Sequence, residues 1–117
     1  MKINLVEVCM ERIMKKSGQI KVAHLSELPL LIGKEVVIAG FELALFKLAN
    51  GTVKAIENKC PHKQGPLSQG IVSGDYVFCP LHDRKISLED GLVQKPDVGC
   101  VKTYDVTVID DNIYIDF

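Results

Sequence analysis

The stretch from residue 60 to residue 82 constrains this chain more than any other part of its sequence. It contains two short motifs, Cys-Pro-His and Cys-Pro-Leu-His, separated by sixteen residues. Thiolates and imidazoles bind zinc or iron–sulfur clusters, whereas magnesium and calcium prefer oxygen. The proline in each motif restricts the backbone and stiffens the turn. We therefore expect two rigid loops that meet around a metal centre, with four ligands: Cys60, His62, Cys79 and His82.

The order of the ligands distinguishes between two kinds of metal centre. Zinc fingers usually take a cysteine pair from one element and a histidine pair from another. Here each motif supplies one cysteine followed by one histidine. If the two loops face each other, the cysteines bind one metal and the histidines another, as in a Rieske 2Fe–2S centre. A structural zinc module used for protein binding is the alternative from another class.

The sequence after residue 18 is a series of short, β-branched and apolar runs between turn-forming residues. No part of it has a convincing helical period, so the predicted fold class is all-β. We expect a small antiparallel β-sandwich or barrel base with an inserted cluster-binding lobe. Asn50-Gly51 predicts a hairpin in which both residues have positive φ. The expected strands are 19–23, 35–39, 41–48, 52–56, 76–78, 85–88, 100–109 and 113–117.

The length of 117 residues is that of one ordinary domain. We expect residues 1–18 to be an extension, either helical or loosely ordered, and residues 19–117 to form the domain itself. Glycine and proline concentrate around the two ligand motifs, which predicts a loop-rich lobe at about 58–96.

Composition excludes several functions. The net charge is −1, which gives no indication of nucleic-acid binding or of an acidic membrane partner. No apolar run approaches the length of a membrane span, and the first residues do not resemble a secretory signal. We therefore expect a cytoplasmic protein with reduced cysteines. Cys9 and Cys100 lack metal-type spacing and are interpreted as free thiols.

The ligand pattern Cys-x-His, sixteen residues, Cys-x-x-His resembles the Rieske family. More narrowly, CPHKQGPLSQGIVSGDYVFCPLHDRKISLEDG followed by PDVGCVKTY closely resembles the small subunit of assimilatory NAD(P)H-dependent nitrite reductases, over about residues 20–117. The resemblance implies a Rieske-type 2Fe–2S cluster. Its inner iron would be bound by Cys60 and Cys79, and its outer iron by His62 and His82.

The resemblance also implies the kind of chemistry. Because protein and sulfide ligands fill every position on both irons, nothing is open for a substrate. The chain would relay single electrons and would have no catalysis of its own. Its partner would be the large sirohaem and flavin subunit, which reduces nitrite to ammonium in nitrate assimilation. A Rieske ferredoxin of an aromatic-ring dioxygenase is the alternative, with the same cluster and another partner.

Some residues near the motifs depart from the family or extend its pattern. The loops lack the extra cysteines of respiratory Rieske proteins, which favours the ferredoxin-like branch. Arg84 stands where the family often has tryptophan, so the packing there is not predicted. Residues 96–99 are expected to form a third loop over the cluster, with a plain turn as the alternative. Four cations form either a docking rim or an ordinary solvated surface: Lys59, Lys63, Arg84 and Lys85.

Overall fold

The computed structural model describes residues 19–60, 65–81 and 83–116. The strands are β1 (Gln19–His24), β2 (Lys34–Ile38), β3 (Phe41–Lys47), β4 (Val53–Glu57), β5 (Ile71–Ser73), β6 (Tyr76–Phe78), β7 (Lys85–Ser87), β8 (Thr103–Ile109) and β9 (Asn112–Asp116). The helices in this part of the chain are two short 3₁₀ helices, η1 (Leu25–Glu27) and η2 (Leu67–Gln69). Among the described residues, no helix is long and apolar enough to cross a membrane.

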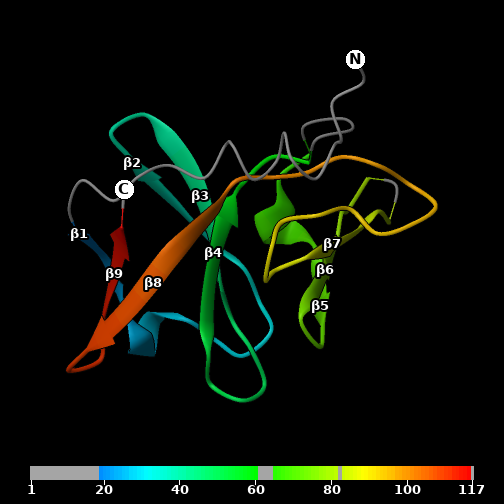
Figure 1. Ribbon diagram of the computed structural model, residues 1–117. Helices are drawn as coiled ribbons and strands as arrows, with labels where there is room; N and C mark the ends of the chain where they lie inside the picture. Colours follow the sequence, from blue (N-terminus) through cyan, green and yellow to red (C-terminus); the bar gives the residue numbers. More distant parts are fainter. Residues whose placement is uncertain (1–18, 61–64, 82, 117) are drawn as a thin grey trace.

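The strands form two antiparallel sheets (Figure 1). The larger sheet, here called the base, has the order β1-β9-β8-β4-β3-β2. The smaller sheet, β5-β6-β7, belongs to a lobe that the chain enters after β4 and leaves before β8. The predicted all-β fold, with an antiparallel base and an inserted lobe, is confirmed. The boundary at residue 18 stays a prediction, since residues 1–18 lie outside the described residues.

Strand β3 is buried on both faces. Leu43, Ala44, Leu45 and Phe46 are all fully buried, although successive side chains of a strand point to opposite sides. Leu43 and Leu45 belong to one hydrophobic core, and Ala44 and Phe46 belong to a second. The uninterrupted apolar run in this strand is therefore explained by packing on both sides of the sheet.

The two cores divide the molecule into the base and the junction with the lobe. The base core consists of Ala23, Leu28, Leu43, Leu45, Val53, Ala55, Ile113 and Ile115. The junction core consists of Ala44, Phe46, Leu48, Ile56, Cys60, Leu67, Val72, Val77, Cys79, Ile86, Leu88, Val93 and Val101. The lobe is thus fixed to the outer face of the base by apolar side chains, and both cysteines of the predicted metal centre lie in this second core.

Gly33 lets the base and the lobe approach closely. A Cβ atom on Gly33 would lie 2.3 Å from the carbonyl oxygen of Ser68 and 2.7 Å from its Cα. Ser68 belongs to η2, which contacts both β2 and β3. Any side chain at position 33 would push the backbone of η2 away from the base.

The turn at Asn50-Gly51 differs from the predicted one. Of the two predicted residues, only Gly51 has positive φ (88°), so the prediction of positive φ at Asn50 is wrong. The Asn50 side chain instead accepts a hydrogen bond from the Thr52 N–H (3.0 Å), and the Gly51 N–H donates to the Leu48 carbonyl (2.8 Å). This is a longer loop that ends in a left-handed glycine.

Two-residue turns with positive φ at both positions occur elsewhere in the chain. Ala39 and Gly40 connect β2 to β3, and Asp110 and Asp111 connect β8 to β9. Both pairs have the backbone signs of a type I′ turn, whose twist matches that of the flanking strands.

Candidate metal centre

The two predicted ligand loops are each closed by an equivalent backbone hydrogen bond. The Cys60 N–H donates to the carbonyl of Gly65 (2.9 Å), and the Cys79 N–H donates to the carbonyl of Arg84 (2.9 Å). In each loop the chain returns to its cysteine five residues later. Because each histidine of the motifs falls within such a closed loop, we call residues 60–65 and 79–84 the first and second ligand loops.

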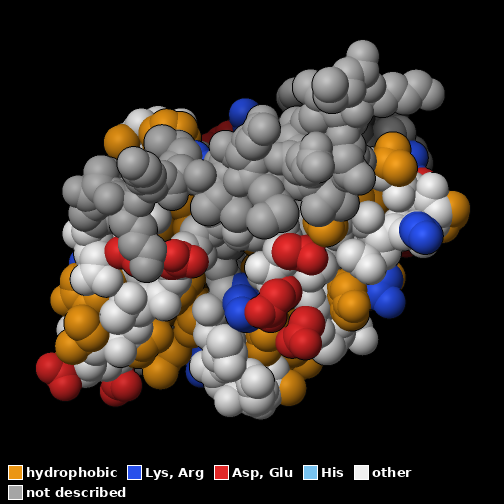
Figure 2. Space-filling model, in the orientation of Figure 1, with side chains coloured by type: hydrophobic (Ala, Val, Ile, Leu, Met, Phe, Trp, Pro, Cys, Tyr) orange, Lys and Arg blue, Asp and Glu red, His pale blue; other side chains and the backbone are white. Residues whose placement is uncertain are grey.

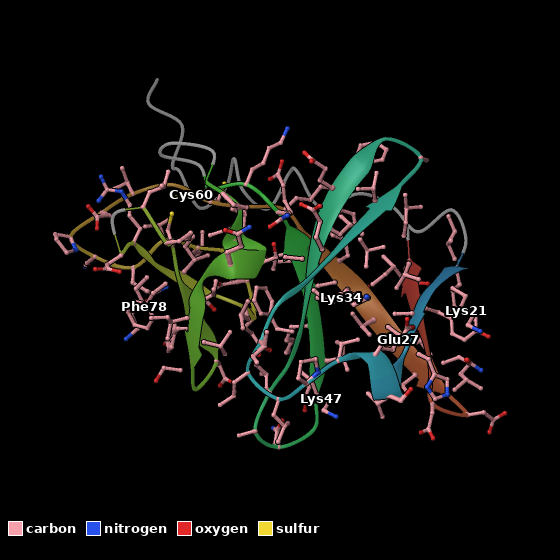
Figure 3. The ribbon with its side chains drawn as sticks, turned by 180° about the vertical axis from the view of Figure 1, so that it is seen from behind. Lys21, Glu27, Lys34, Lys47, Cys60 and Phe78 are labelled. Carbon is pink, nitrogen blue, oxygen red and sulfur yellow. The ribbon has the colours of Figure 1, made fainter. Side chains whose placement is uncertain are left out.

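Both cysteines of the two motifs are buried and outside any disulfide bond. Cys60 and Cys79 each have about 1% of their surface exposed, and they share the junction core. Figure 3 shows Cys60 at the upper end of the lobe, beyond the 3₁₀ helix η2. Two buried thiols in one apolar environment suit thiolate ligands that are shielded from water.

Gly65 brings the first ligand loop against the second. A Cβ atom at this position would lie 2.9 Å from Cγ and Cδ1 of Leu81 and 3.5 Å from the Cys79 sulfur. The backbone of one loop therefore approaches the sulfur of the other. This contact brings the two loops that carry Cys60 and Cys79 together.

The two predicted histidine ligands, His62 and His82, lie outside the described residues, so their binding role stays a prediction. Among the residues that the structure describes, no three metal-binding side chains are grouped together. The third histidine, His24, ends β1 and caps η1, where its Nδ1 lies 2.8 Å from the Ser26 hydroxyl.

The second ligand loop has a special backbone conformation after the histidine. Asp83 has a φ of 53°, in the left-handed region that aspartate adopts more readily than most residues. Its N–H donates to the carbonyl of Cys79 (2.9 Å), so this loop is closed by two hydrogen bonds to its cysteine.

Among the described residues, the cations of the predicted basic rim each have a partner. Arg84 forms an ion pair with Asp97, and Lys59 lies 3.7 Å from the Glu42 carboxylate. Lys85 lies over the ring of Tyr76, 4.2 Å from its centre. Lys63 lies outside the described residues. The rim is thus less strongly positive than its sequence suggests, because two of its charges are paired.

Sequence reasoning missed Asn58, which precedes the first ligand loop. This side chain is buried (3% exposed), donates to the Glu35 carboxylate (2.7 Å) and accepts from the Ser68 N–H (2.7 Å). Its own N–H donates to the carbonyl of Glu42 (3.0 Å). Asn58 therefore connects β2, β3 and η2 at the point where the chain approaches Cys60. The only signal in the sequence was an asparagine directly after strand β4.

Cys100 is buried and disulfide-bonded, so its interpretation as a free thiol is wrong. The sequence predicted reduced cysteines only because a cytoplasmic location was expected. The expected location alone does not exclude a single disulfide bond. Cys9 lies outside the described residues.

A polar groove of about 430 Å³ lies between β4, β8 and the turn after β7. Lys54 and Glu89 form an ion pair across it (3.5 Å), and Figure 2 shows acidic side chains gathered around a basic one on this face. Burial, and secondly the charge of Glu57, raises the pKa of Tyr104 in its wall. Among the described residues that line the groove, there is no cysteine or histidine.

Comparison with known proteins defines the class of this domain. The model of the Rieske [2Fe-2S] domain family matches residues 18–105, and the chain belongs to this family. A domain of this kind carries a Rieske-type 2Fe–2S cluster and transfers electrons in an oxidoreductase system. The two buried thiols fit that cluster, because cysteine thiolates make up half of the ligand set of a Rieske centre. The family match thus favours the cluster over structural zinc.

Relatives with known names belong to several such systems. The chain is 32% identical to the ferredoxin component of the naphthalene 1,2-dioxygenase system of Pseudomonas aeruginosa, over 69% of this chain and 78% of that protein. It is 46% identical to the 4beta-methylsterol monooxygenase of Methylococcus capsulatus over 44% of this chain, which spans only 14% of that enzyme. A solved structure assigned as an NADPH nitrite reductase small subunit matches with a TM-score of 0.75 and 31% identity, over 84% of this chain and 97% of that one.

Proposed function

We propose that this chain is the electron-transferring small subunit of an NAD(P)H-dependent nitrite reductase. In this proposal Cys60, His62, Cys79 and His82 bind its 2Fe–2S cluster. The ligand assignment is supported by the two closed loops, which begin at the two buried thiols and meet at Gly65. The choice of system is supported by the likeness to the nitrite reductase small subunit, which extends over nearly the whole of that chain.

When bound, the cluster accepts one electron at a time and passes it on. The residues of this chain determine how that happens. Cys60 and Cys79 would hold the cluster from the junction core, where both thiols are shielded from water. The closing hydrogen bonds hold the two ends of each ligand loop together. With every position on the irons filled, the chain itself would not bind nitrite.

The proposed partner is the large subunit that carries sirohaem and flavin, in the cytoplasm, where the complex would reduce nitrite to ammonium. A reconstitution experiment tests the partner. The large subunit of the same organism is assayed for nitrite-dependent oxidation of NAD(P)H, with this chain, without it, and with its Cys79→Ser variant. We expect turnover to require the unmodified chain. Equal turnover in all three mixtures would contradict the proposal.

A second candidate is the ferredoxin component of an aromatic-ring dioxygenase. It is favoured by the match to the naphthalene dioxygenase ferredoxin, of which this chain covers 78%. The two candidates share the cluster and differ only in the protein that receives the electron. Pre-reduced chain is therefore mixed in a stopped-flow instrument with either the nitrite reductase large subunit or a ring-hydroxylating oxygenase. The faster reoxidation identifies the partner.

A further inference from the structure

The ion pair between Arg84 and Asp97 joins the second ligand loop to another part of the chain. Asp97 belongs to the loop 94–99, thirteen residues further along. The two side chains are 23% and 34% exposed. They are less solvated than a typical surface pair, so the attraction between them is less screened.

Backbone hydrogen bonds connect this pair to the predicted ligand Cys79. The carbonyl of Arg84 accepts from the Cys79 N–H (2.9 Å), while the carbonyl of its neighbour Lys85 accepts from the Gln94 N–H (2.8 Å). The Asp97 N–H in turn donates to the carbonyl of Gln94 (3.2 Å). Arg84 therefore binds the cysteine loop through its backbone and the loop 94–99 through its side chain.

We propose that Arg84 and Asp97 are a positioning pair for the cluster. The pair holds the loop 94–99 against the second ligand loop, and each member cancels the charge that the other would place beside the cluster. The inference rests on the proposed role of Cys79 as a ligand, and it is independent of which enzyme is the redox partner. The ion pair also explains why an arginine fits at position 84, where the family often has tryptophan.

Neutralising one member of the pair or the other should shift the reduction potential in opposite directions. If Asp97 is neutralised, the unpaired guanidinium favours the reduced, more negative cluster, and the reduction potential rises. If Arg84 is neutralised, the unpaired carboxylate disfavours reduction, and the potential falls. Neutralising both should return the potential towards that of the unmodified chain. The mechanical connection between the loops, however, is lost in all three variants.

The test uses Arg84→Gln, Asp97→Asn and the double variant, with Arg84→Lys as the conservative rescue. Reduction potentials are measured by redox titration, and cluster release is followed by absorbance in the presence of an iron chelator. We expect opposite shifts in potential for the two single variants and cancellation in the double variant. Release should be roughly two- to five-fold faster in all three, as for a pair of modest strength. Arg84→Lys should keep the original potential.

Matched controls come from the ion pair between Lys54 and Glu89, which belongs to neither ligand loop. Lys54→Gln and Glu89→Gln make the same charge changes and should shift the potential less. Shifts of one sign in both single variants, or unchanged potential and release, would overturn the proposed pair. If Cys79→Ser retained the cluster, the ligand assignment would be wrong instead. Hydrogen exchange of the 94–99 amides in the apo-protein adds a readout without the cluster, and unchanged exchange in Arg84→Gln would also contradict the proposal.

Discussion

Asn58 is the single residue that most clearly connects the base to the first ligand loop. Replacing it by alanine removes two side-chain hydrogen bonds and leaves the Ser68 N–H and the Glu35 carboxylate without their partner. We expect Asn58→Ala to lower the free energy of unfolding by about 2–3 kcal/mol, measured by urea denaturation.

The control for Asn58 is a double variant in which the hydrogen-bond donor and acceptor at positions 58 and 35 are exchanged. Asn58→Asp keeps an acceptor for the Ser68 N–H but places a second carboxylate beside Glu35. Adding Glu35→Gln restores a donor and an acceptor with their roles exchanged, and should recover much of the lost stability. A loss below about 0.5 kcal/mol for Asn58→Ala, as at an ordinary surface position, would contradict this role.

The residues of the candidate site were predictable from sequence to different degrees. The thiols at Cys60 and Cys79 followed from a short, specific motif that depends only on neighbours in the chain. The pairing of Arg84 with Asp97 did not, because it depends on how two loops meet in space. Asn58 was missed for the same reason, since its partners come from two other elements.

At the scale of elements, a prediction follows from β3, because its side chains pack into both cores. Phe46 belongs to the junction core, which contains both cysteines, whereas its neighbour Leu45 belongs to the base core. Phe46→Ala and Leu45→Ala should each lower the stability of the apo-protein by about 3–4 kcal/mol, because both side chains are fully buried. Only Phe46→Ala should also accelerate cluster release strongly.

The comparison of these two variants separates local from general destabilisation. Stability is measured by denaturant unfolding after cluster removal, and release by transfer of iron to a chelator. Equal acceleration of release at an equal loss of stability would show that the two cores are not independent. It would refute the assignment of the ligand loops to the junction core.

Most elements were predictable from the sequence, and the exceptions have physical reasons. The strong apolar run of β3 could be predicted without knowing what covers it. Strand β5 was missed because it has only three residues, and because the exposed Ile71 and the buried Val72 are both apolar, so the sequence does not alternate. Strand β8 begins at Thr103, later than predicted, since Cys100 instead forms an isolated bridge with Leu92.

At the scale of the whole molecule, the fold separates a stable support from the metal-binding part. The base has its own core, and the ligand loops belong to the lobe and its junction. Metal binding should therefore stabilise mainly the lobe, while the base can keep its fold without the cluster. On the proposed ligand assignment, this division explains how two short loops would hold a cluster in a chain of 117 residues.

The central claim is that two histidines and two cysteines of this chain bind one 2Fe–2S cluster. The most direct test is pulsed electron spin resonance of the reduced protein labelled with ¹⁵N-histidine. The chain has three histidines, so His24→Gln is a matched control for His62→Gln and His82→Gln. We predict coupling to two histidine nitrogens, unchanged in His24→Gln and lost or altered in each of the others. Coupling that depends on His24, or no histidine coupling at all, would contradict the account.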